Sequence, residues 1–125
     1  MPAQYTDRRS EPRVDCDDRG ALVLMPRGEA VTCRILDQSA SGARVSISGL
    51  DTVPEDLWLI DLDLNLARRG RAAWTTAMRM GLRFTFAQQL KAGAPRPEKV
   101  PESVYRAWLE LRGHSPEPDG VVYFD

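Results

Sequence analysis

Apolar residues recur at every second position along most of this 125-residue chain, and this period of two restricts the fold more than any other feature. Successive side chains of a β-strand point to opposite faces, so each alternating run predicts a strand with one buried face. The runs are Ala21–Met25, which is almost wholly apolar, Val31–Ile35, Ala43–Ile47, Trp58–Leu66 and Met78–Phe86, and Ala73 with Trp74 completes a sixth strand. Residues typical of turns separate the runs. The pattern predicts an all-β fold, an antiparallel barrel or sandwich.

The C-terminal third has a different composition. Pro101 and Glu102 are typical of the first turn of a helix, and Val104, Trp108 and Leu111 would then share one apolar face. We expect this helix to pack on the barrel, with a partner or dimer helix as the alternative. The predicted layout is a flexible N-terminal arm (1–18), a barrel (19–87), a Gly- and Pro-containing linker (88–100), one C-terminal helix (101–113) and an irregular tail (114–125).

The charge balance limits the possible partners. The formal net charge is −1 at pH 7, so the whole molecule is not suited to non-specific binding of DNA or of anionic membranes. The N-terminus lacks the apolar core of a signal peptide, and no stretch is long and apolar enough to span a bilayer. We therefore expect a cytoplasmic protein with no membrane partner. Alternation with Val31 and Ile35 makes Cys33 a core residue rather than half of a disulfide.

Catalytic and metal-binding patterns are missing from the sequence. His114 is the sole histidine and falls in the predicted tail, which argues against a nucleophile–histidine site or zinc. The segment Asp61–Asn65 begins like a calcium loop, but Leu66 stands where that loop needs glycine. We expect no enzyme activity, no metal and no cofactor.

Two short motifs carry the chemistry that remains. The first, Arg9-x-x-x-Arg13, follows Arg8 and contains a proline that disfavours helix. The second, Asp37-x-Ser39-x-x-Gly42, lies at the turn between two predicted strands. Arginine binds phosphate oxygens and the O6/N7 edge of guanine, whereas a carboxylate accepts from guanine N1–H and N2–H.

Each motif alone has an ordinary structural explanation. The first could be a solvated arm, and Arg79 and Arg83 repeat its spacing within a predicted strand. The second could simply close a turn, because Asp and Ser side chains bond nearby backbone amides. The combination is what points to a function.

The combination resembles the PilZ domain, a bacterial receptor module for cyclic di-GMP, and every position of both family motifs is present. Gly70–Trp74 and Met80–Phe84 are similar to the family's last two barrel strands, so the resemblance covers about residues 5–87. It implies a six-stranded antiparallel PilZ-type barrel that binds cyclic di-GMP. The implied ligand-binding residues are Arg8, Arg9, Arg13, Asp37, Ser39 and Gly42, with Trp74 beside them. An arginine at position 8 is associated in the family with a stacked pair of ligands.

The resulting hypothesis is a non-enzymatic receptor. Its arginine arm folds over the dinucleotide against the turn at Asp37–Gly42 and so presents a new surface to an unidentified downstream protein. Two alternatives remain open: a PilZ-like protein-interaction module with weak or no nucleotide binding, and a small RNA-binding barrel that uses the run Arg68–Arg71.

Overall fold

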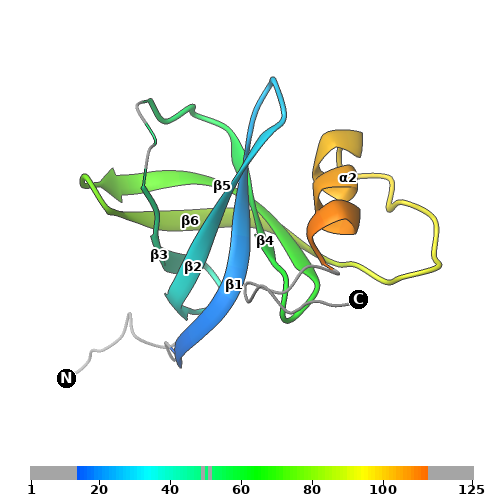
Figure 1. Cartoon of the computed structure of the whole chain (residues 1–125), viewed down its shortest axis with the longest axis horizontal. Coiled ribbons are helices and arrows are strands. Elements are labelled where there is room, and N and C mark those ends of the chain that lie inside the picture. The colour runs from blue at the N-terminus through cyan, green and yellow to red at the C-terminus, as the bar shows by residue number, and fades with distance from the viewer. Residues whose placement is uncertain (1–13, 49, 51, 113–125) are drawn as a thin grey trace, which may run out of the picture.

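The computed structural model describes residues 14–48, 50 and 52–112, which form a six-stranded antiparallel β-barrel and one C-terminal helix (Figure 1). The elements are β1 (Val14–Leu24), β2 (Glu29–Gln38), β3 (Gly42–Ser46), β4 (Leu57–Asp61), β5 (Leu66–Thr75), β6 (Arg79–Gln89) and α2 (Glu102–Leu111). The strand order is β1-β2-β3-β6-β5-β4, and β4 closes the ring by pairing with β1. The all-β fold class and the single C-terminal helix are confirmed.

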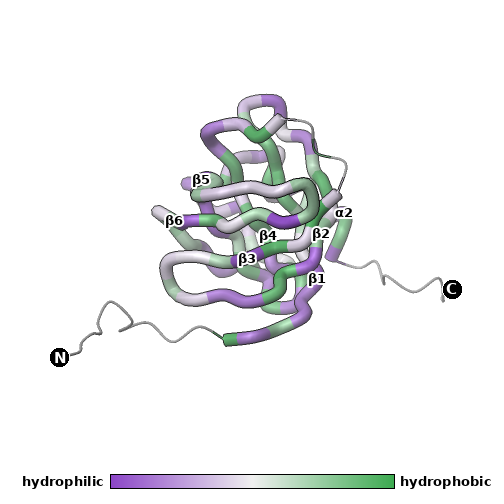
Figure 2. Tube along the Cα trace, turned by 90° about the vertical axis from the view of Figure 1, so that its left-hand side faces the viewer, coloured by the Kyte–Doolittle hydropathy of each residue, from purple (hydrophilic) through white to green (hydrophobic). Residues whose placement is uncertain are grey.

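One hydrophobic core fills the barrel interior. Alternate residues of the strands point inward, which agrees with the repeated change between hydrophobic and hydrophilic residues along the strands in Figure 2. The predicted core positions Val45 and Ile35 are fully buried, and Cys33 is buried with them. Desolvation raises the pKa of the Cys33 thiol to about 12, so this cysteine is an inert core residue.

A second core joins α2 to the outside of the barrel. Trp108 and Val104, both on the predicted apolar face, are buried against Val23, Trp58 and other residues of β1 and β4. This packing confirms the interpretation that the helix covers the barrel (Figure 1). No helix among the described residues has the length and apolar character needed to cross a membrane.

The sequence-based assignment of a single strand over Trp58–Leu66 is wrong. β4 ends at Asp61, and the chain turns before β5 begins at Leu66. The Asp61 carboxylate accepts hydrogen bonds from the N–H groups of Asp63 and Leu64, both at 3.0 Å, and Asn65 takes a left-handed φ of 56°. These local contacts stabilise a turn although the leucines keep the period of two.

The element boundaries also differ from those expected. β1 begins at Val14, so residues 14–18 belong to the barrel and not to the arm. β6 continues to Gln89, two residues beyond the expected end of the barrel. The sixth predicted strand, at Ala73 and Trp74, is the end of the ten-residue strand β5.

Candidate ligand-binding site

The β2–β3 turn carries the Asp-x-Ser-x-x-Gly motif and is closed by backbone hydrogen bonds. The Ser39 N–H donates to the Gly42 carbonyl at 2.8 Å, and the Phe84 N–H donates to the Ser41 carbonyl at 2.7 Å. The first bond closes the turn, and the second ties it to β6. Ser39 and Gly42 are thus part of a firmly placed corner of the barrel.

A β-bulge decides which way the motif aspartate points. Ile35 pairs with Val45, but Asp37 pairs with Arg44, so Leu36 is an extra residue on β2 relative to β3. Simple alternation would place Asp37 on the inner face with Ile35. The extra residue instead places Asp37 on the outer face with Arg44, because a bulge reverses the alternation beyond it.

Asp37 is almost fully buried, with 3 % of its surface exposed, although it lies on this outer face. Arg44 Nη2 lies 2.8 Å from Asp37 Oδ2. This ion pair compensates the carboxylate and orients it, as a buried charge requires.

A second bulge places Trp74 on the same outer face. Ala72 pairs with Leu82 and Trp74 pairs with Gly81, so Ala73 is the extra residue of β5. A Cβ atom at position 81 would lie 2.2 Å from the Trp74 Nε1, which shows that the indole packs directly on the glycine backbone. The side of the indole away from Gly81 is open, and Trp74 is 45 % exposed.

The registers bring these residues into adjoining rows across four strands. Gly81 pairs with both Arg44 and Trp74, so Asp37, Arg44, Gly81 and Trp74 follow one another from β2 to β5. In the next row Arg83 pairs with both Gly42 and Arg71. Arg83 thereby lies beside the end of the β2–β3 turn.

Two hollows of the barrel surface are each lined in part by Trp74. One hollow of about 300 Å³ is lined by Asp37, Arg44, Trp74 and Arg83 together with neighbouring residues of β3, β5 and β6. Another, of about 470 Å³, is lined by Val53, Pro54, Arg71 and Trp74, among others. An additional hollow of about 470 Å³ is lined by Thr32, Ser46, Leu111 and others, and it contains none of the predicted site residues.

The predicted site residues are therefore distributed as follows. Asp37 and Trp74 share a hollow, and Ser39 and Gly42 are in the turn at its edge. Arg8, Arg9 and Arg13 lie outside the described residues.

Sequence reasoning missed Arg44 and Arg83 as residues of this site. Arg83 appeared to be the chance repeat of the Arg-x-x-x-Arg spacing, yet its register on β6 places it beside Asp37 and Trp74. The available signal was that both arginines alternate with apolar residues and so point outward, but only the strand pairing and register show which outward residues are adjacent.

The arginine run Arg68–Arg71 does not form a single basic patch. Arg68 points inward and donates to the Ser39 carbonyl at 2.8 Å. Arg69 points outward and binds both carboxylate oxygens of Asp56, at 3.0 and 3.1 Å. This separation removes the continuous basic surface on which the RNA-binding alternative depends.

The outer face combines arginine, a compensated carboxylate and an exposed indole on a rigid barrel. Such a surface is chemically suited to an anionic ligand with planar groups, because arginine binds anions and indole stacks on aromatic rings. The family model of the PilZ domain matches residues 7–92, and the chain belongs to this family. PilZ domains are receptor and adaptor modules of cyclic di-GMP signalling. No curated protein matches the chain.

Proposed function

We propose that the protein is a cyclic di-GMP receptor whose ligand lies on the outer face of β3, β5 and β6 beside the β2–β3 turn. The observation that carries this proposal is the hollow shared by Asp37, Trp74 and Arg83, which come from three different strands. Two independent bulges are needed to bring Asp37 and Trp74 to this face. Membership of the PilZ family supports the choice of ligand.

Each group has a chemical role in this proposal. Trp74 stacks on a guanine, and Arg83 binds a phosphate or the O6/N7 edge of a base. Asp37, oriented by Arg44, accepts from guanine N1–H and N2–H, while Ser39 and Gly42 let the ligand approach the turn. These roles use both kinds of group that the ligand offers, the two phosphates of its ring and its two guanine bases.

The arginine arm completes the proposed site. The arm with Arg8, Arg9 and Arg13 directly precedes β1. The first residues of β1 pair with β2 next to the motif turn, because Asp15 pairs with Asp37. The chain therefore enters the barrel beside the site, and the arm can reach the ligand from there. Folding of the arm over the ligand changes the surface that a downstream protein meets, and no chemical step is involved.

Calorimetric titration with cyclic di-GMP tests the function. We expect binding that is abolished by Arg9→Ala or Arg13→Ala and strongly weakened by Trp74→Ala. Arg69→Ala is the matched control. Arg69 is in β5, as Trp74 is, but it forms an ion pair with Asp56 and neither residue lines the hollow. Absence of binding by the wild-type protein would overturn the proposal and favour the protein-interaction alternative.

Amide hydrogen exchange tests the movement of the arm. Residues 7–14 should gain protection when ligand is added, because ordered amides exchange more slowly. Unchanged protection in the presence of tight binding would mean that the arm takes no part.

A further inference from the structure

Four polar side chains belong to the inward-facing positions at the barrel end beneath the β2–β3 turn, and together we call them the polar layer. They are Asp18, Gln38, Asp61 and Arg68. Asp18 pairs with the core residue Ile35, and Arg68 pairs with the core residue Leu59. Small barrels fill such positions with apolar side chains, and buried charges need partners. The polar layer therefore requires an explanation beyond packing.

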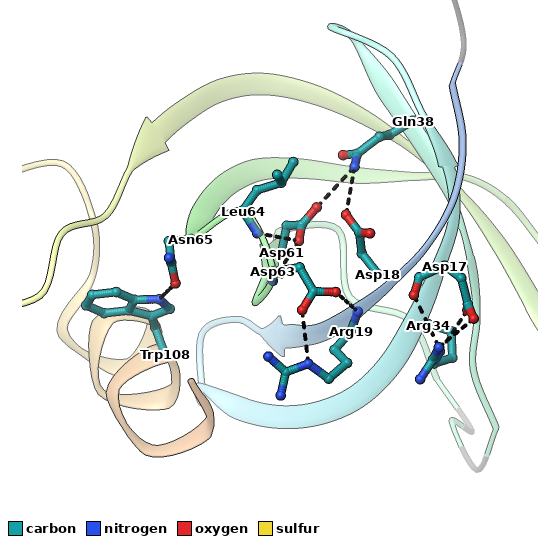
Figure 3. A network of polar contacts seen from close by, with 10 residues as sticks. All are labelled: Asp17, Asp18, Arg19, Arg34, Gln38, Asp61, Asp63, Leu64, Asn65 and Trp108. Atoms are coloured by element: carbon teal, nitrogen blue, oxygen red, sulfur yellow. Dashed lines mark hydrogen bonds and ion pairs between the residues drawn. The ribbon is translucent and has the colours of Figure 1, made fainter. Parts of the chain in front are cut away.

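Gln38 connects the polar layer to the motif. It stands between Asp37 and Ser39, and its Nε2 donates to Asp61 Oδ2 at 3.0 Å and, less closely, to Asp18 Oδ2 at 3.4 Å (Figure 3). Its Oε1 is buried and has no hydrogen-bond partner among the described residues. The amide is thus anchored through its nitrogen, and its position depends on the two carboxyl groups.

Arg68 supports the same turn from β5. Its Nη1 donates to the Ser39 carbonyl at 2.8 Å, and its guanidinium lies 4.8 Å from the centre of the Phe84 ring. The backbone N–H of Phe84 in turn holds the Ser41 carbonyl. Desolvation lowers the pKa of Arg68 and the charge of Asp61 opposes this shift, yet guanidinium remains protonated in proteins.

We propose that Arg68 and Gln38 are positioning residues of the ligand site, and that the Asp18–Asp61 carboxyl pair links ligand binding to proton uptake. This inference rests on the proposed function, because it describes how the same turn is held and regulated.

The surroundings of the pair explain why it shares a proton. The carboxylates and thiols nearby are Asp17 and Cys16 on β1, Cys33 on β2 and Asp63 after β4, and the cations are Arg19, Arg34 and Arg68. Arg34 binds Asp17 at 2.7 Å and Arg19 binds Asp63 at 3.1 Å, as Figure 3 shows. These ion pairs neutralise the outer carboxylates. Carboxylate oxygens of Asp18, Asp61 and Asp63 lie within 4.8 Å of one another, so like charges are held close together.

The direction of the linkage follows from charge. Desolvation, followed by the hydrogen bond and charge of Asp61, raises the pKa of Asp18 to about 6. Below this pH Asp18 is protonated and can donate to Asp61, whereas above it the two carboxylates repel each other. A dianionic ligand favours the state with fewer negative charges, so binding raises the pKa further. Because this linkage is reciprocal, the ligand should bind more tightly on the acid side of the titration.

Calorimetry with cyclic di-GMP at about pH 6.5, in two buffers of different ionisation enthalpy, tests the linkage. We expect proton uptake by the wild-type protein and none by Asp18→Asn, which keeps the size of the side chain. Binding without proton uptake overturns the linkage and leaves the proposed function intact. Absence of any binding overturns the proposed function itself.

The positioning role is tested with variants of the arginine run. Arg68→Ala should weaken binding at least tenfold, Arg68→Lys should restore part of the loss, and Arg69→Ala should bind like the wild type. Equal affinities of folded Arg68→Ala and Arg69→Ala overturn the positioning role. Carbon NMR titration of the carboxyl groups in the ligand-free protein measures the shared proton separately, and titration of Asp18 with the ordinary aspartate pKa of 3.8 overturns that part.

Discussion

The contact between Gly81 and Trp74 allows stability and ligand binding to be separated. In Gly81→Ala the new Cβ would lie 2.2 Å from Trp74 Nε1 and 2.4 Å from Cε2, whereas ordinary contacts begin at 3.4 Å. The indole must therefore move by more than an ångström. Because Trp74 is already 45 % exposed, it can swing into solvent at little cost. Replacing glycine by alanine in a strand recovers roughly 0.5–1 kcal/mol of backbone entropy.

The expected result is a folded variant that binds poorly. Loss of base stacking on an aromatic side chain costs about 1–3 kcal/mol, which corresponds to roughly 5- to 150-fold in the dissociation constant. The melting temperature should change by only a few degrees, since the backbone gain and the displacement of the indole offset each other. Calorimetric titration with cyclic di-GMP and thermal unfolding measure the two quantities.

A double-mutant cycle provides the control. Gly81→Ala and Trp74→Ala should each weaken binding, and the double variant should bind no more weakly than Trp74→Ala, because both changes remove the same stacking contact. Wild-type affinity in Gly81→Ala would refute the reasoning. Additive losses would show that Gly81 acts in a way that does not involve the indole.

Three further predictions test the site, the polar layer and the helix. Arg83→Ala should weaken binding of cyclic di-GMP by about tenfold or more in calorimetry, whereas Arg69→Ala should not, because a charge-assisted hydrogen bond contributes about 1.5–3 kcal/mol. Since the folded pKa of Asp18 is raised to about 6, the wild-type protein should lose stability as the pH rises from about 4 to 6, and urea unfolding should show a smaller loss for Asp18→Asn. Trp108→Ala should lower the free energy of unfolding by about 3–5 kcal/mol in urea, because Trp108 is 1 % exposed and its Nε1 donates to Asn65 at 2.9 Å. Unchanged urea midpoints in that variant would contradict the docking of α2 on the barrel.

Much of the fold could be predicted because its signals are local. The alternation of Val31–Ile35 and Ala43–Ile47 indicates buried strand faces, and those positions are in the core. The spacing of Val104 and Trp108 predicts the helix face that packs on β1 and β4. The failure at Asp61–Asn65 is also instructive, since a turn stabilised by one aspartate interrupted a pattern of leucines that looked continuous.

The candidate site could be predicted only in part. The motif identified Asp37, Ser39 and Gly42, and the tryptophan was expected nearby, but Arg44 belongs to no motif and Arg83 looked like a chance repeat of the arginine spacing. Their membership of the site depends on which strands pair and in which register, and strand pairing is a property of the closed barrel. The sequence suggested a role for Arg68 only within an RNA-binding surface over Arg68–Arg71, whereas its place opposite Leu59 directs it into the barrel.

The sequence by itself determined the all-β class, the C-terminal helix and the position of the motif turn, because these follow from side-chain period, helix signals and turn chemistry within short segments. The tertiary structure decided the directions of Asp37 and Trp74. Each follows a bulge, and the extra residue of a bulge is defined only relative to the strand beside it. A shift of one position reverses the face to which every later side chain points, so the outer-face site exists only once the strands have paired.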